Sequence, residues 1–97
     1  MKIIAVTACP TGIAHTYMAA ATLSSVGREM GHDVKVETQG AMGIENELRP
    51  AEISAADLVI FAADIAIENE ARFNGKRVLH VPIREVLKDA RKVLTRI

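Results

Sequence analysis

The chain has 97 residues, of which 12 are basic and 12 acidic, and it contains one cysteine, three histidines and no tryptophan. This length suits a single domain over residues 1–97, able to bury one core without metal or disulfide support. The balanced charge argues against nucleic-acid binding, and the scattered histidines argue against a metal site. No apolar run approaches the 18 or so residues of a membrane span, and a lone thiol suits the reducing cytosol.

Strands and helices are expected to alternate along the first part of the chain. Residues 2–8 are apolar and β-branched, as in a central strand that is covered on both faces. The apolar positions that follow predict a helix from His15 or Thr16 to Met30. Residues 34–38 alternate strictly in polarity, which predicts a strand with one face toward water.

The rest of the chain continues this pattern. In order, we expect a loop over residues 39–47, a short helix from Pro50 to about Ala56, a buried strand over 58–63, a short helix over 66–73, a strand over 77–81 and a last helix from Ile83.

The alternation predicts an α/β fold, a three-layer α/β/α sandwich around a four-stranded parallel sheet. The two most apolar strands, 2–8 and 58–63, are expected at the centre, which gives the strand order 2-1-3-4. In such sheets ligands bind beyond the carboxyl ends of the strands, at the switch point beside the first strand. Cys9 is the first residue past that end, so the fold places its thiol where chemistry is expected.

The loop C-P-T-G-I-A-H-T, residues 9–16, has the features of an anion site. A phosphoryl group on sulfur carries about two negative charges and three acceptor oxygens. A loop that enters a helix offers unpaired backbone amides and the positive end of the helix dipole. We expect the donors to be the amides of Thr11, Gly12, Ile13, Ala14, His15 and Thr16, with Gly12 allowing the backbone to curl closely around the anion.

The same amides would prepare Cys9 as a nucleophile. An ordinary thiol has a pKa of about 8.5 and is only about 3% ionised at pH 7. A helix dipole supplies about 0.3–1 kcal/mol, so several converging donors are needed to lower the pKa of Cys9 substantially. The alternative is that Cys9 is a small apolar filler of the core, as many buried cysteines are.

Two further residues have a functional and a structural interpretation. His15 either donates to the phosphate or stabilises the thiolate as an imidazolium, or it is a water-facing residue at the start of the helix. Asp64 ends the strand over 58–63 at the same sheet edge as Cys9. It is either a general acid or partner contact, or the cap of the helix that follows.

The loop resembles the active loop of the fructose-specific enzyme IIB component of the bacterial phosphoenolpyruvate-dependent sugar phosphotransferase system. The likeness extends over essentially the whole chain and includes E-T-Q-G (37–40), F-A-A-D (61–64) and R-F-N-G-K (72–76). The resemblance implies a protein-Nπ-phosphohistidine–D-fructose phosphotransferase with a P-loop-like phosphocysteine loop after the first strand. In that family the cysteine, here Cys9, takes a phosphoryl group from a phosphohistidine of the IIA component.

The resemblance also implies partners and a location. The group on Cys9 passes to fructose or a related sugar bound by the membrane-embedded IIC component, during uptake. The protein would be cytoplasmic and reach the inner membrane only through IIC. No cofactor or metal is required, because positioning and fixed dipoles stabilise the transferring group.

Three alternatives stay open. The first is a low-molecular-weight cysteine phosphatase, whose loop is C-x5-R; here His15 stands at the arginine position, and Asp64 would be the acid. The second is a IIB component for another sugar, such as a mannosyl compound. The third is a binding or sensor module with Cys9 as a redox switch, although a second cysteine is missing for a thioredoxin-like cycle.

Overall fold

The apolar run at the start of the chain forms the centre of the sheet. A computed structural model describes residues 1–10 and 14–96 of the protein. In it, β1 (Lys2–Ala8) pairs in parallel with β2 (Asp33–Gly40) on one side and with β4 (Leu58–Ala63) on the other. β5 (Val78–Val81) pairs in parallel with β4. The predicted order of the four parallel strands is therefore confirmed.

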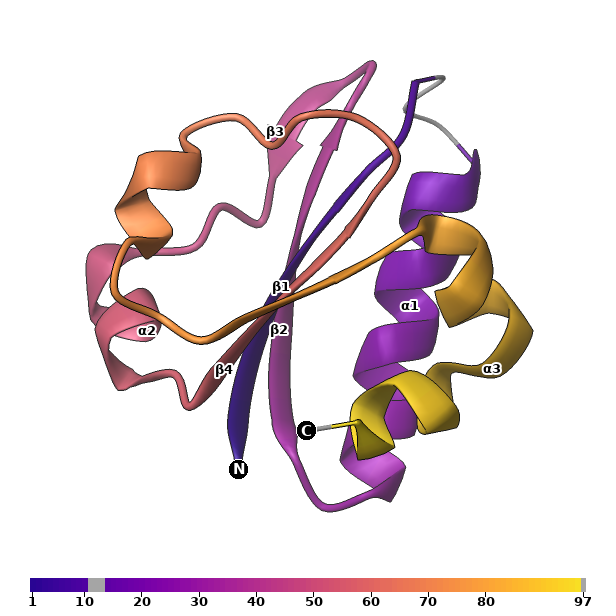
Figure 1. The fold of residues 1–97 in the computed structure, drawn as a ribbon. Helices are drawn as coiled ribbons and strands as arrows, with labels where there is room; N and C mark the ends of the chain where they lie inside the picture. The colour runs from indigo at the N-terminus through magenta and orange to yellow at the C-terminus, as the bar shows by residue number, and fades with distance from the viewer. Residues whose placement is uncertain (11–13, 97) are drawn as a thin grey trace.

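A fifth strand lies at the edge of the sheet. β3 (Gly43–Glu45) pairs antiparallel with β2, which gives the order β3-β2-β1-β4-β5 (Figure 1). The prediction of a loop over residues 39–47 and of only four strands was wrong here. Gly43 has a φ of 90°, so the chain reverses tightly after Gly40 and returns along β2.

Helices cover both faces of the sheet, as predicted. α1 (Ala14–Glu29) and α3 (Ile83–Thr95) lie side by side on one face, whereas α2 (Pro50–Ala55) lies on the other (Figure 1). The short helix expected over residues 66–73 is only a single 3-10 turn, η1 (Glu70–Phe73), and it lies on the α2 face. No helix among residues 1–10 and 14–96 is long and apolar enough to cross a bilayer.

The sheet separates two apolar clusters. Ile3, Ala5 and Cys9 belong to the cluster beneath α1 and α3, together with Leu23, Ile60 and Val86. Ile4 and Val6 belong to the cluster on the other face, together with Val59, Phe61 and Phe73. Successive residues of a strand point to opposite faces, so a strand covered on both faces must be apolar throughout. This explains the unbroken apolar runs of β1 and β4.

The prediction that β2 exposes one face to water was wrong. Lys35, Glu37 and Gln39 share the face that looks toward α2 and η1. Glu37 is fully buried and Gln39 is only 5% exposed. The alternation that marks a solvated strand therefore marks here a row of polar side chains that is covered by later parts of the chain. Glu37 and Gln39 have hydrogen-bond partners in these later parts of the chain.

Candidate functional site around Cys9

Cys9 comes directly after β1, at the edge where the parallel strands end. Cys9 is only 4% exposed and packs in the apolar cluster beneath α1 and α3. It nevertheless lines an open hollow of about 300 Å³. Further lining residues are Pro10 beside Cys9, residues at the end of β2 and residues of the segment after β4: Gln39, Gly40, Ala41, Ile65, Ala66 and Glu68. The cysteine therefore belongs to the core cluster and also lines a surface hollow.

Thr16 gives the sulfur a hydrogen-bond donor. Its hydroxyl lies 3.1 Å from Cys9 Sγ, and the residue is fully buried in the first turns of α1. Its backbone carbonyl accepts a hydrogen bond from the hydroxyl of Thr7 over 3.1 Å, which ties the helix to β1. A donor aimed at a sulfur atom favours the thiolate over the thiol. The structure thus supports the predicted proximity of Thr16 to Cys9.

The remaining residues of the predicted phosphate cradle divide into two groups. Ala14 and His15 are the first two residues of α1, and both are exposed. Thr11, Gly12 and Ile13 lie outside the described residues, so their part in the cradle stays a prediction. The described part of the loop places the Thr16 hydroxyl against Cys9, and the role of His15 also stays a prediction.

Asp64 lies at the same sheet edge but is bound to another element. One of its carboxylate oxygens accepts a hydrogen bond from the backbone amide of Ile83, at 3.3 Å, and its own amide donates to the carbonyl of Ala8, at 3.0 Å. It therefore holds the first residue of α3, not the segment that follows it in sequence. A capping role was expected, but for the wrong helix.

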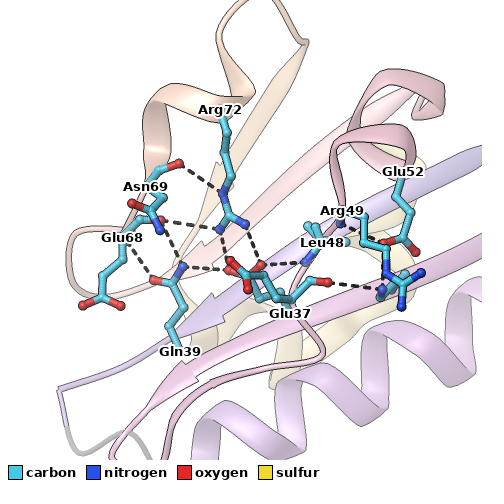
Figure 2. Close-up of polar contacts among 10 residues, drawn as sticks. Glu37, Gln39, Leu48, Arg49, Glu52, Glu68, Asn69 and Arg72 are labelled. Atoms are coloured by element: carbon cyan, nitrogen blue, oxygen red, sulfur yellow. Dashed lines mark hydrogen bonds and ion pairs between the residues drawn. The ribbon is translucent and has the colours of Figure 1, made fainter.

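Sequence reasoning missed a network of polar side chains next to the hollow. Figure 2 shows the contacts of this network. The buried carboxylate of Glu37 faces the guanidinium of Arg72, with distances of 2.8 Å and 2.5 Å from its two oxygens. The same carboxylate accepts hydrogen bonds from the amide of Leu48, at 2.9 Å, and from the side chain of Gln39, at 2.8 Å. Gln39 in turn bonds the backbone of Glu68.

The charge of Glu37 is stabilised by these donors. Burial would raise the pKa of this carboxyl group, but hydrogen bonds from Arg72, Leu48 and Gln39 outweigh burial and hold its pKa below the ordinary value. A buried carboxylate with its hydrogen bonds satisfied is compatible with a folded core. The polar letters of 37–40 gave a weak signal for this network, whereas the partner Arg72, 35 residues away, could not be read from spacing.

Comparisons with known proteins agree with this geometry. A family model described as "PTS system, Lactose/Cellobiose specific IIB subunit" matches residues 4–96. The "PTS system fructose-like EIIB component 2" of Escherichia coli K12 is 51% identical over 96 residues, covering 99% of this chain and 91% of the relative. The "PTS system 2-O-alpha-mannosyl-D-glycerate-specific EIIABC component" of the same strain is 49% identical over 92 residues, covering 95% of this chain and 14% of the relative.

A solved structure shows the same fold at similar identity. It is a domain from the fructose-specific IIABC component of the phosphotransferase system of Borrelia burgdorferi, with a TM-score of 0.92 and 45% sequence identity. The match covers 97% of this chain and 89% of that one. With the family match over nearly the whole length, these findings establish that the chain belongs to the IIB family of the sugar phosphotransferase system.

Proposed function

We propose that Cys9 carries a phosphoryl group from a IIA component to a sugar held by a IIC component. In the first step the thiolate of Cys9 attacks the phosphorus of a phosphohistidine. The S–P bond forms as the N–P bond breaks, and the imidazole nitrogen keeps the electron pair and takes up a proton. In the second step a sugar hydroxyl oxygen attacks the phosphorus, the S–P bond breaks, the sulfur leaves as thiolate and the hydroxyl proton passes to a base or to water.

The observation that carries this proposal is the hydrogen bond from Thr16 to Cys9 Sγ, at a residue that lines the hollow. A carrier needs a sulfur that is ionised to attack phosphorus and stable enough to leave again. A buried hydroxyl donor serves both requirements, because it favours the thiolate as nucleophile and as leaving group. An open hollow lets two partners reach the same sulfur in turn.

The phosphoryl oxygens are proposed to bind at the start of α1. This helix has 16 residues and begins at Ala14, five residues after Cys9. The N-terminal amides of a helix and its dipole both favour an anion at this position. The amides of residues 11–16 are proposed to donate to the three oxygens, with the hydroxyl of Thr16 adding a further donor. This scheme requires no metal and no cofactor.

Names of relatives support the two partners. The mannosylglycerate relative and the Borrelia protein are both named as IIABC components, in which the B part belongs with A and C parts. We propose that this chain meets the same two kinds of partner, on the cytoplasmic side of the inner membrane, where IIC holds the sugar.

Three exposed apolar side chains are available for such contacts. Met42 in the turn between β2 and β3 is 77% exposed, Met18 on α1 is 54% exposed, and Ile65 at the hollow is 45% exposed. Large apolar side chains on a surface commonly mark protein contacts. Because both partners must reach one sulfur, we expect them to contact the surface around Ile65 in turn.

The proposed sugar is fructose or a fructose-like compound. The chain shares 51% identity with a fructose-like component and 49% with a mannosylglycerate component, so a mannosyl sugar is the second candidate. A panel of sugars, offered to membranes that contain a matching IIC component, would separate them. The proposal predicts phosphoryl transfer to fructose or a close analogue at the highest rate, and transfer to mannosylglycerate alone would contradict it.

A cysteine phosphatase is the competing enzyme class. That chemistry uses an arginine six positions after the cysteine, and His15 stands there instead. Without this bidentate grip on the phosphate, rapid hydrolysis is not expected. The test compares p-nitrophenyl phosphate hydrolysis with phosphoryl transfer from a phosphorylated IIA component. We expect transfer within seconds to minutes and negligible hydrolysis, and rapid partner-independent hydrolysis would favour the phosphatase.

A further inference from the structure

One wall of the Cys9 hollow lies outside the helices and strands of the protein. Ile65, Ala66 and Glu68 line the hollow, and the residues from Asp64 to Asn69 form an irregular segment between β4 and η1. Asn69 has a φ of 57°, in the left-handed region that residues other than glycine adopt rarely. The position of this wall must therefore be maintained by contacts with other parts of the chain.

Gln39 supplies two of these contacts. Its side-chain oxygen accepts a hydrogen bond from the backbone amide of Glu68, at 2.8 Å, and its side-chain nitrogen donates to the carbonyl of the same residue, at 3.1 Å (Figure 2). A side-chain amide that grips both backbone groups of one residue acts like a short piece of neighbouring strand. Because Gln39 itself lines the hollow, this grip lies next to Cys9.

Glu37 sets the orientation of that amide. The side-chain nitrogen of Gln39 also donates to a carboxylate oxygen of Glu37, at 2.8 Å. An ionised carboxylate accepts hydrogen bonds and cannot donate them, so the nitrogen of the amide must face Glu37. The oxygen is then left to face the amide of Glu68. If the side-chain amide of Gln39 were flipped, its oxygen would face the carboxylate of Glu37 and its nitrogen would face the backbone amide of Glu68, so neither pair could form a hydrogen bond.

Arg72 of η1 binds both Glu37 and the end of the segment that contains the wall. Its two terminal nitrogens face Glu37, and its Nε donates to the carbonyl of Asn69, at 3.1 Å. The exposed fraction of its side chain is only 18%. The charge pair thus connects β2 to the turn that follows the wall.

We propose that Gln39 is a positioning residue for phosphoryl transfer, which holds the Ile65–Glu68 wall against the Cys9 hollow while Glu37 and Arg72 orient its amide. This inference rests on the proposed function of Cys9. The wall sets the space in which a phosphohistidine ring meets the sulfur, and small errors in such alignment reduce transfer rates strongly.

The test uses Gln39→Met, which keeps the length of the side chain, adds no charge beside the phosphate and removes all three hydrogen bonds. Transfer from a phosphorylated IIA component to Cys9 should fall about tenfold in kcat, with KM changed less than about threefold, because the substitution is expected to disturb alignment at the sulfur more than docking. The backbone amide of Glu68 should exchange hydrogen faster. Alkylation of Cys9 by iodoacetamide should stay within about twofold, since the Thr16 contact remains.

A matched control lies on the same face of the same strand. Lys35 pairs with Glu52 at 2.7 Å, four residues before Gln39 and away from the hollow. Glu52→Gln removes this ion pair, and transfer should stay at the wild-type rate. If Gln39→Met does not fold, Arg72→Lys serves instead; it keeps a cation near Glu37 but loses the planar fork, and it should lower kcat in the same direction.

The outcomes separate this inference from the proposed function. A folded Gln39→Met variant that transfers at the wild-type rate, or that leaves the exchange of the Glu68 amide unchanged, overturns the positioning role. If Arg72→Lys has to be used, a wild-type kcat overturns it as well. Failure of the wild-type protein to accept phosphate on Cys9 overturns the proposed function instead, while the exchange measurement still reports whether Gln39 holds the wall.

Discussion

The hydroxyl of Thr16 donates a hydrogen bond to Cys9 Sγ across 3.1 Å, joining the first turn of α1 to the residue directly after β1. Because this donor favours the thiolate, Thr16→Val is expected to raise the pKa of Cys9. A hydrogen bond to a charged group contributes about 1.5–3 kcal/mol, so alkylation by iodoacetamide at pH 7 should slow about tenfold.

Thr16→Ser is the matched control for this prediction, since it keeps the hydroxyl and should alkylate close to the wild-type rate. The measurement is the alkylation rate of Cys9 between pH 5 and pH 10. An identical pH profile in wild type and Thr16→Val would contradict the assigned role of the hydroxyl.

The buried ion pair predicts a large difference between two arginine substitutions. Arg72→Met leaves Glu37, which is fully buried, without its cation and should lower the free energy of unfolding by about 3 kcal/mol. Arg91→Ala removes the Arg91–Glu29 pair, whose side chains are 57% and 60% exposed, and should change it by no more than about 0.5 kcal/mol. Urea titrations measure the free energy of unfolding of both variants. Equal losses would show that the buried Glu37–Arg72 pair contributes no more than the exposed pair.

The pH dependence of stability should carry the signature of Glu37. Its hydrogen bonds from Arg72, Leu48 and Gln39 hold its pKa below the ordinary 4.5 in the folded protein. The stabilisation by the charged form is therefore complete above about pH 4.5 and is lost as the pH falls through the lowered pKa. Glu37→Gln should be less stable than wild type at pH 7, and the difference should shrink on acidification below about pH 4. A difference that stays constant from pH 7 to pH 3 would contradict this account.

Gly27 on α1 marks a close approach between the helix and the sheet. A Cβ atom there would overlap Cγ2 of Val34 on β2. Glycine to alanine in an open helix position stabilises by about 1 kcal/mol, whereas overpacking costs about 1–3 kcal/mol. We therefore expect Gly27→Ala to destabilise the protein. Adding Val34→Ala should recover part of the lost free energy of unfolding, measured by urea titration. A Gly27→Ala variant that is more stable than wild type would show that α1 can move away from β2 at little cost.

Much of the fold could be predicted from the sequence because its strongest signals are local. The apolar runs 2–8 and 58–63 identify strands covered on both faces, and the turn residues between elements divide the chain correctly. β3 was missed because a strand of three residues carries too short a pattern. The turn before η1 was taken for a helix because its composition is helical while its conformation is set by contacts with β2.

In the candidate site too, local contacts could be predicted from the sequence and long-range contacts could not. Cys9 and Thr16 belong to one short loop, so their proximity follows from local sequence and from the position of the loop after the first strand. Glu37 and Arg72 meet only after β2 and η1 have packed against each other, and alternation made Glu37 look water-facing. A single sequence contains no signal that pairs residues so far apart.

The most direct measurement locates phosphate on the protein after incubation with phosphoenolpyruvate, the general phosphotransferase proteins and a IIA component. Mass spectrometry of the digested protein should find one phosphoryl group on the peptide that contains Cys9. The group should disappear when membranes with IIC and sugar are added, and Cys9→Ser should remain unlabelled. Phosphate on any other residue, or its presence in Cys9→Ser, would contradict the assignment of Cys9 as the carrier.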